Sequence, residues 1–257
     1  MSVSCTPPTG SAFPIGDSRV TCTVTDAMQR SGSCTFTVTV SQRPPSPRLS
    51  IIRIVAFGNS MTEGVDGDTH TPAFPYPMQL QTMLSDRYYD QTFAVFNEGR
   101  GGELVSDGLR RLPGRIAADS PQVVLLLEGV NDINFPGGDV NIPTMADTLR
   151  NMLKITNSQG IPALLGTLVP QRPGGSKAGN PSGIERANRQ IRDVAAREGA
   201  TVIDLYQGFG GSPDPYIGAD GLHPNRDGYR RMAELFFDAI RARFEVAPGV
   251  PFLTRLR

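Results

Sequence analysis

The chain has 257 residues, 39% of them hydrophobic, and its 25 basic residues balance 25 acidic ones to a formal net charge of +0. Because there is no basic surplus to release counterions from a phosphate backbone, no nucleic-acid partner is expected. The longest apolar runs, such as VVLLL at 123–127, are strand-sized and far shorter than the roughly 20 residues of a membrane-spanning helix, so no membrane span is expected.

Residues 1–41 differ in composition from the rest of the chain. They are rich in Ser, Thr and Val and contain all three cysteines, Cys5, Cys22 and Cys34. The stretches RVTCTVTD at 19–26 and SCTFTVTV at 33–40 alternate with period two, which predicts two strands with a turn between them. We therefore expect a small β segment here, followed by a Pro-rich, extended linker over residues 42–49.

Beyond the linker, short apolar runs alternate with longer stretches of helical periodicity. Strands are predicted at about 51–57, 93–97, 122–128, 161–168 and 200–205. Helices are predicted at 76–89, 103–118, 143–160, 183–199 and 226–244. Apolar strands that are each followed by a helix predict a parallel sheet covered on both faces. We assign residues 50–247 to one three-layer α/β/α domain and residues 248–257 to a C-terminal tail.

In such a sheet, ligands bind beyond the carboxyl ends of the strands. The connections expected at that edge are 58–73, 97–103, 129–142, 169–183 and 206–224. Several of them are rich in Gly and Pro and longer than a compact connection needs. Candidate functional residues are therefore sought in these loops.

Ser60 directly follows the first strand of this domain, in IVAFGNSMTEG. Taken alone, it could be a helix cap. A serine hydroxyl becomes a nucleophile when a base takes its proton, and the chain contains only two histidines. His223 lies in ADGLHPNRDGY, after the last predicted strand, and Asp220 precedes it by a spacing that lets a carboxylate reach the imidazole. His70, in DGDTH, is expected to be a surface residue.

Attack on an ester creates an oxyanion, and the loops at the same edge contain donors for it. NEGRGGE at 97–103 offers backbone N–H groups around Gly102, and LLLEGVNDIN places the Asn131 amide just after the third strand. With the N–H of Ser60, these groups make three candidate donors. The chemistry needs no cofactor. A calcium site built from Glu63, Asp66 and DGDTH is the weaker alternative, because the spacing fits no known loop.

Four blocks of the sequence resemble those of the SGNH hydrolases, also called the GDSL lipase/esterase family. The blocks are Gly58-Asn59-Ser60 with Gly64, then Gly102, then Gly129-Val130-Asn131-Asp132, and finally Asp220-Gly221-Leu222-His223. The resemblance covers about residues 50–245 and implies a flavodoxin-like sheet of five parallel strands. It also implies a nucleophile at Ser60, a base at His223, an orienting acid at Asp220, and oxyanion donors at Ser60, Gly102 and Asn131. The family usually has Asp where this chain has Asn59.

The amino-terminal segment resembles the carboxyl half of a hyalin repeat, an immunoglobulin-like extracellular β module. We expect the leading strands of a full repeat to lie outside this sequence. The resemblance implies a disulfide between the outer cysteines, Cys5 and Cys34, with Cys22 free. Such a disulfide indicates a secreted or extracellular protein, although MSVSCTPPTG does not read as a secretory signal.

These residues predict a serine esterase acting on a small-molecule ester or an acylated glycan, with short acyl chains favoured because no long apolar lid is evident. A carbohydrate acetyl esterase, a thioesterase or an acyltransferase would use the same residues. An alternative of a different class is an extracellular adhesion or glycan-binding protein with an inactive hydrolase domain. Asn59 is the one feature that favours it.

Overall fold

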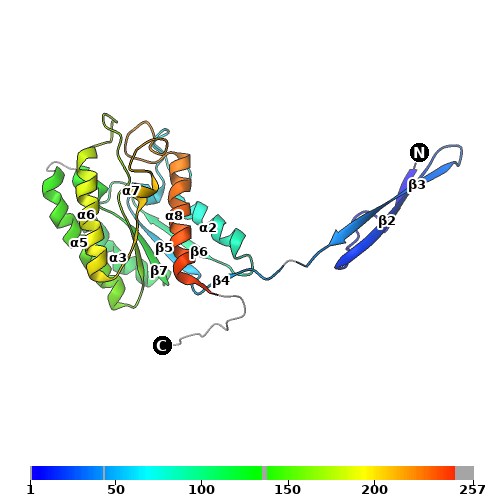
Figure 1. The fold of residues 1–257 in the computed structure, drawn as a ribbon, viewed down its shortest axis with the longest axis horizontal. Helices are drawn as coiled ribbons and strands as arrows, with labels where there is room; N and C mark the ends of the chain where they lie inside the picture. Colours follow the sequence, from blue (N-terminus) through cyan, green and yellow to red (C-terminus); the bar gives the residue numbers. More distant parts are fainter. Residues whose placement is uncertain (1, 43, 135–137, 247–257) are drawn as a thin grey trace. The chain divides into compact units, whose positions relative to one another are not determined.

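The computed structural model describes residues 2–42, 44–134 and 138–246 (Figure 1). The chain divides into two units, Met1–Pro45 and Ser46–Arg257, which are described separately below. The predicted tail, 248–257, lies outside the described residues.

The first unit is a three-stranded antiparallel sheet of β1 (Ser2–Thr6), β2 (Gly16–Thr25) and β3 (Ser31–Val40), in the order β1-β2-β3. The two strands and the turn predicted from the sequence are present. Strand β1 was not predicted, since its five residues are too few for an alternating pattern to stand out.

The expected disulfide between Cys5 and Cys34 is wrong: Cys5 is bonded to Cys22, and Cys34 is free and exposed. The strand order explains the pairing. Cys5 faces Cys22 across β1 and β2, and Cys22 faces Cys34 across β2 and β3, so the strand β2 separates the two outer cysteines. Strands are spaced about 4.8 Å apart, so two spacings exceed the reach of a disulfide.

The second unit is built on a parallel sheet of β5 (Arg53–Gly58), β6 (Ala94–Gly99), β7 (Val123–Leu127), β8 (Ala163–Gly166) and β9 (Thr201–Ile203). The spatial order is β6-β5-β7-β8-β9, the flavodoxin-like order in which the first strand lies between the second and the third. This confirms the predicted five-stranded fold. The central strand β7, VVLLL, is buried along its whole length, as a strand covered on both faces must be.

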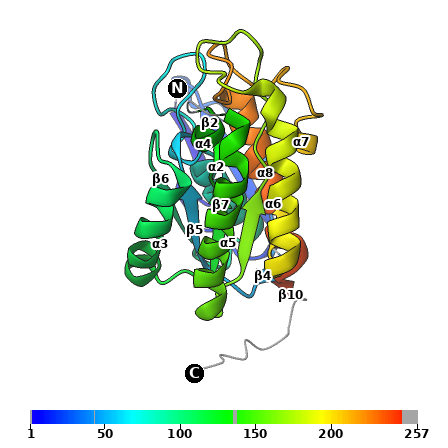
Figure 2. The ribbon, with the colours of Figure 1, turned by 90° about the vertical axis from the view of Figure 1, so that its left-hand side faces the viewer.

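Helices α3 (Val105–Asp119), α5 (Ile142–Ser158) and α6 (Ile184–Glu198) lie on one side of the sheet, and α2 (Tyr76–Arg87) and α8 (Arg226–Phe244) on the other (Figures 1 and 2). The apolar residues spaced three or four apart in α8 face the core, where Phe236 stacks on Tyr76 of α2 at a centroid distance of 4.9 Å. These layers hold the sheet rigid and leave its carboxyl edge to the loops.

Several short elements complete this unit. They are β4 (Arg48–Leu49), α1 (Ser60–Glu63), α4 (Val130–Asn134), η1 (Gly138–Asn141), η2 (Pro181–Gly183), α7 (Leu205–Gly208) and β10 (Glu245–Val246). Strand β4 pairs antiparallel with β10, and Leu49 is fully buried, so the end of the stretch predicted as a linker is built into this unit. Two-residue strands carry too little pattern to be predicted.

Candidate active site

The site lies at the carboxyl edge of the sheet, where β5 and β7 are neighbours. From these two strands the chain runs on in opposite directions across the sheet, first to β6 and then to β8. Open α/β sheets generally bind their ligands at such a point. Ser60 follows β5 and Asn131 follows β7. The fold therefore brings two of the predicted site residues to neighbouring strand ends.

Ser60 is the first residue of α1, in a tight turn directly after β5. The turn requires Gly58, because a Cβ there would lie 2.2 Å from Thr62 Oγ1 and 2.3 Å from the carbonyl oxygen of Leu127. Asn59 caps the helix: its Oδ1 accepts a hydrogen bond from the Met61 N–H at 3.1 Å. The side chain that departs from the usual family residue thus holds the turn that carries Ser60.

His223 links Ser60 to Asp220 through hydrogen bonds on both ring nitrogens. Nε2 of His223 lies 2.9 Å from Ser60 Oγ, and Nδ1 lies 2.6 Å from Asp220 Oδ2. All three side chains are buried. A ring nitrogen at that distance from a carboxylate carries the proton, which leaves Nε2 as an acceptor for the serine hydroxyl.

The turn around Asp220 fixes the carboxylate as well as the imidazole. Asp220 Oδ1 accepts hydrogen bonds from the N–H groups of Leu222 and His223, both at 2.9 Å. Burial acts to raise the pKa of Asp220, but these bonds and the one from the His223 ring hold it below its ordinary value. Asp220 is therefore a carboxylate at neutral pH.

The loop from β5 packs directly against the turn that carries His223. The Gly67 N–H donates to the Pro224 carbonyl at 3.1 Å, and the Asp220 N–H donates to the Gly67 carbonyl at 3.0 Å. A Cβ on Gly67 would lie 2.3 Å from the His223 carbonyl oxygen, so only glycine allows this approach. Two loops from opposite ends of the domain are thereby joined at the site.

His70 comes from the same loop and is half exposed, as predicted for a surface residue, yet its Nδ1 lies 3.8 Å from Asp220 Oδ2. The Asp66 carboxylate, considered as a calcium ligand, instead accepts the N–H groups of Asp68 and Thr69 at 2.9 Å and so shapes the loop. Over residues 2–42, 44–134 and 138–246, no three His, Cys, Asp or Glu side chains lie close enough to hold a metal ion.

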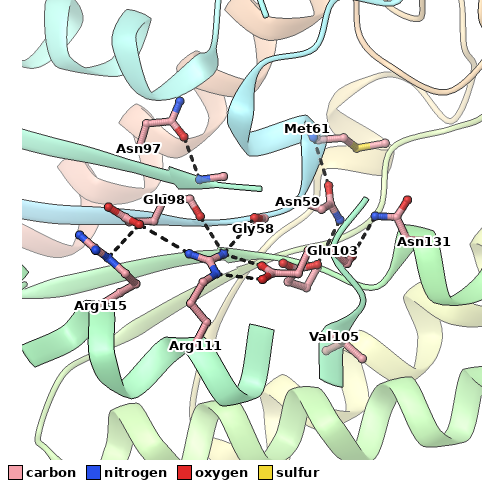
Figure 3. A network of polar contacts seen from close by, with 12 residues as sticks. Gly58, Asn59, Met61, Asn97, Glu98, Glu103, Val105, Arg111, Arg115 and Asn131 are labelled. Atoms are coloured by element: carbon pink, nitrogen blue, oxygen red, sulfur yellow. Dashed lines mark hydrogen bonds and ion pairs between the residues drawn. The ribbon is translucent and has the colours of Figure 1, made fainter. Parts of the chain in front are cut away.

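Two of the predicted oxyanion donors, Gly102 and Asn131, are connected through Glu103. The Asn131 amide donates to the Glu103 carbonyl at 2.8 Å, which ties the start of α4 to the loop after β6 (Figure 3). An amide nitrogen has two hydrogens, so one stays available. Gly102, with φ of +73°, is exposed in that loop, and nothing lies within 4 Å of the place a Cβ would take. Among the described residues, its N–H donates no hydrogen bond to another backbone group.

A buried polar network behind the nucleophile turn was missed by the sequence analysis. Glu128 and Glu103 are buried beside Asn59, and Arg111 of α3 forms an ion pair with Glu103 (Figure 3). The one indication of this network in the sequence is Glu128, a charged residue directly after the five apolar residues of a buried strand. Such a residue needs a partner when it is buried.

A model of the GDSL-like lipase/acylhydrolase family matches residues 56–231, and a model of the HYR domain matches residues 1–40. The chain belongs to the GDSL-like lipase/acylhydrolase family, which is a family of carboxylic ester hydrolases. Both resemblances noted in the sequence are thereby confirmed.

Curated relatives are esterases. The chain is 27% identical to esterase TesA of Pseudomonas aeruginosa over 203 residues, which cover 78% of this chain and 91% of TesA. It is 26% identical to an acetylxylan esterase of Xylanibacter ruminicola over 216 residues, 77% of this chain but 45% of that protein. The chain thus spans about half the length of the acetylxylan esterase.

Solved structures share the fold of the second unit. A lipase/acylhydrolase from Enterococcus faecalis is 25% identical with a TM-score of 0.64, and the match covers 78% of this chain and 100% of that one. A variant of Axe2, an acetyl xylan esterase from Geobacillus stearothermophilus, is 19% identical with a TM-score of 0.61, and the match covers 77% of this chain and 99% of that one.

Among the helices of the described residues, none combines the length and the hydrophobicity that a membrane span requires.

Proposed function

We propose that the chain is a serine esterase that works through an acyl-enzyme. The observation that supports it most is the unbroken series of hydrogen bonds from Ser60 Oγ through the His223 ring to Asp220. In this mechanism Ser60 attacks the ester carbonyl while His223 Nε2 takes the hydroxyl proton, then returns it to the leaving alcohol. Water, deprotonated by the same ring nitrogen, releases the acid and restores Ser60.

Asp220 would hold the ring in the acceptor tautomer and stabilise the imidazolium that forms in each half-reaction. The N–H groups of Ser60 and Gly102 and the Asn131 amide would donate to the oxyanion. Loss of one such donor typically costs on the order of 10²–10³ in rate. The Gly102 N–H, which donates to no other backbone group of the described residues, and the anchored Asn131 amide support this assignment.

The natural substrate proposed is a short-chain acyl ester, and an acetylated glycan is the more specific candidate. A cavity of about 500 Å³ beside Gly102 favours a polar alcohol group, because glycines and charged side chains line it. Its lining residues are Arg100, Gly101, Gly102, Glu103, Asp107, Arg110 and Arg111. Two of the similar proteins are acetyl xylan esterases by name, which supports the same substrate class.

The HYR-like unit and its disulfide support an extracellular location for this activity. Thioesterase or acyltransferase chemistry would need the same three side chains. An inactive adhesion domain is less well supported, since Asn59 caps α1 and leaves Ser60 in contact with His223.

The test is hydrolysis of p-nitrophenyl esters from acetyl to palmitoyl by the wild type and by Ser60→Ala. We expect kcat/KM to be highest for acetyl or butyryl and to fall with chain length, and Ser60→Ala to retain only background turnover. Equal turnover by both proteins would rule out the serine mechanism, and a preference for palmitoyl would rule out the short-chain assignment.

A further inference from the structure

Glu128 follows β7, and its carboxyl group is fully buried directly behind the nucleophile turn. Its Oε2 accepts a hydrogen bond from Asn59 Nδ2 at 3.2 Å. The other side of the same amide, Oδ1, caps α1 through the Met61 N–H at 3.1 Å (Figure 3). Asn59 is therefore a bridge with Glu128 at one end and the first turn of the Ser60 helix at the other.

Arg111 of α3, the cation of this network, pairs with Glu103 and Glu98 and not with Glu128. Arg111 donates to both carboxylate oxygens of Glu103, and also to the carbonyl oxygen of Glu98 at 3.0 Å (Figure 3). Its guanidinium further pairs with the Glu98 carboxylate at 3.5 Å. No cation of the described chain forms an ion pair with Glu128, and among the same residues its Oε1 has no hydrogen-bond partner.

A buried carboxyl group without a cation is far more stable when it is protonated. Burial raises the pKa of Glu128 well above its ordinary value, and the neighbouring Glu103 carboxylate raises it further. The negative charge of Asp132 also raises the pKa of Glu128. Tyr76 is neutral because burial raises its own pKa, and the positive charge of Arg111 is balanced by its ion pair with Glu103. A protonated Glu128 can also donate its O–H to Glu103, which a carboxylate could not.

We propose that Glu128 is a positioning residue, a neutral carboxylic acid that holds the nucleophile turn in place through Asn59. Its neighbour Glu103 is ion-paired with Arg111 of α3, so the acid lies between the turn and that ion pair. The part of this proposal that concerns catalysis rests on the proposed esterase function. The protonation of Glu128 does not rest on it and can be tested without any substrate.

The first test compares thermal unfolding of wild type and Glu128→Gln from pH 5 to pH 8. Between the pKa of Glu128 in the unfolded chain and its higher pKa in the folded protein, the folded protein keeps a proton that the unfolded chain has lost. Wild-type stability is therefore lost as pH rises above the unfolded value of about 4.3. Glutamine keeps an acceptor for Asn59 and a donor for Glu103 but has no proton to lose. The folding constant of Glu128→Gln relative to wild type should thus rise by about tenfold per pH unit in this range.

A ratio that stays flat with pH would contradict the proposal, because it would mean that Glu128 is ionised in the folded protein. Glu103→Gln is the matched control, since it removes the other carboxyl group of the pair. If Glu103→Gln, and not Glu128→Gln, removed the pH dependence, the proton would belong to Glu103 and the proposal would be wrong.

The second test measures kcat and KM for p-nitrophenyl acetate with Glu128→Gln and Glu128→Leu. We expect Glu128→Gln to stay within about threefold of wild type and to lose less activity at alkaline pH, because its bridge cannot ionise. Glu128→Leu should lower kcat at least tenfold with little change in KM, since Asn59 loses its acceptor and the turn its position.

Val124→Ala controls for stability alone, because Val124 is buried at the other end of β7. It should destabilise the protein and leave kcat unchanged. Equal kcat values for Glu128→Leu and wild type would overturn the positioning role. Inactivity of wild type itself would overturn the esterase proposal and leave the first test to decide the protonation.

Discussion

Both histidines lie near the same oxygen of Asp220, Oδ2, but only His223 is hydrogen-bonded to Ser60. His223 is buried with Nε2 at 2.9 Å from the hydroxyl, whereas His70 is half exposed with Nδ1 3.8 Å from Asp220. A base must be within hydrogen-bonding distance of the proton it takes. The geometry therefore assigns the proton transfer to His223 under the proposed mechanism.

We expect His223→Ala to lower kcat for p-nitrophenyl acetate by roughly 10³-fold or more and His70→Ala to change it by less than about fivefold. Both variants remove one imidazole near Asp220, so each is the control for the other. A larger loss in His70→Ala than in His223→Ala would reverse the assignment.

Asp220 should make the stability of the fold depend on pH in the acidic range. Its pKa is lower in the folded protein than in the unfolded chain, so the stabilisation is present above about pH 3.9 and lost as pH falls through the lower folded value. Asp220→Asn should flatten this acid-side loss in thermal unfolding between pH 2 and pH 6. It should also lower kcat at pH 7 by roughly 10²–10⁴-fold.

The control for that experiment is Asp193→Asn, which changes an exposed carboxylate of α6. It should leave both the acid-side slope and kcat as they are in the wild type. Parallel unfolding curves for Asp220→Asn and wild type would contradict the electrostatic account of the site.

At the scale of elements, the site depends on close contact between two loops rather than on any one helix. The loop that follows α1 meets the turn before α8 at Gly67, where hydrogen bonds run in both directions. A side chain at this position has no space, because the nearest atoms belong to backbone. The distance between Ser60 and His223 is therefore set in part by a residue that takes no part in the chemistry.

Gly67→Ala should destabilise the fold by about 1–3 kcal/mol and lower kcat as well, since the added methyl pushes against the His223 carbonyl. Gly114→Ala is the matched control. Gly114 lies in α3 with nothing within 4 Å of a Cβ, so alanine there should stabilise by about 0.5–1 kcal/mol with unchanged kcat. Urea unfolding and steady-state kinetics would measure both. Unchanged kcat in Gly67→Ala would show that this contact does not position the base.

Long periodic segments were predictable, and short or long-range features were not. The helix at 226–244 was predicted with the bounds it has, because its apolar residues repeat along one face over many turns. Ser60, His223 and Asp220 could be predicted as a group because few residue types can do this chemistry and the chain has only two histidines. The structure places them within hydrogen-bonding distance, and their catalytic roles stay a prediction. The ion pair of Arg111 with Glu103 could not be found, since nothing local indicates which buried charges will meet.

At the scale of the whole chain, the cysteine pairing shows where analogy with a module failed. The resemblance implied that the outer cysteines are joined, but β2 lies between them in the sheet. Strand order is a property of the sheet and cannot be read from the spacing of cysteines. The disulfide belongs to the unit Met1–Pro45, whereas the three site residues all belong to the unit Ser46–Arg257.

Alkylation of the denatured, unreduced protein should therefore modify one thiol, and peptide mapping should place it at Cys34. Reduction of the Cys5–Cys22 disulfide in the folded protein should leave kcat/KM for p-nitrophenyl acetate unchanged. Modification at Cys22 would contradict the pairing, and loss of activity on reduction would contradict the independence of the site.

The identity of the nucleophile is tested most directly by covalent trapping with diethyl p-nitrophenyl phosphate, followed by intact mass and peptide mapping. The Ser60 hydroxyl, hydrogen-bonded to a buried imidazole, should displace p-nitrophenolate once per chain. We predict one diethylphosphoryl group per chain, on the peptide that contains Ser60, and none in His223→Ala over the same time. A label on another residue, or no label on protein that hydrolyses p-nitrophenyl acetate, would contradict the account.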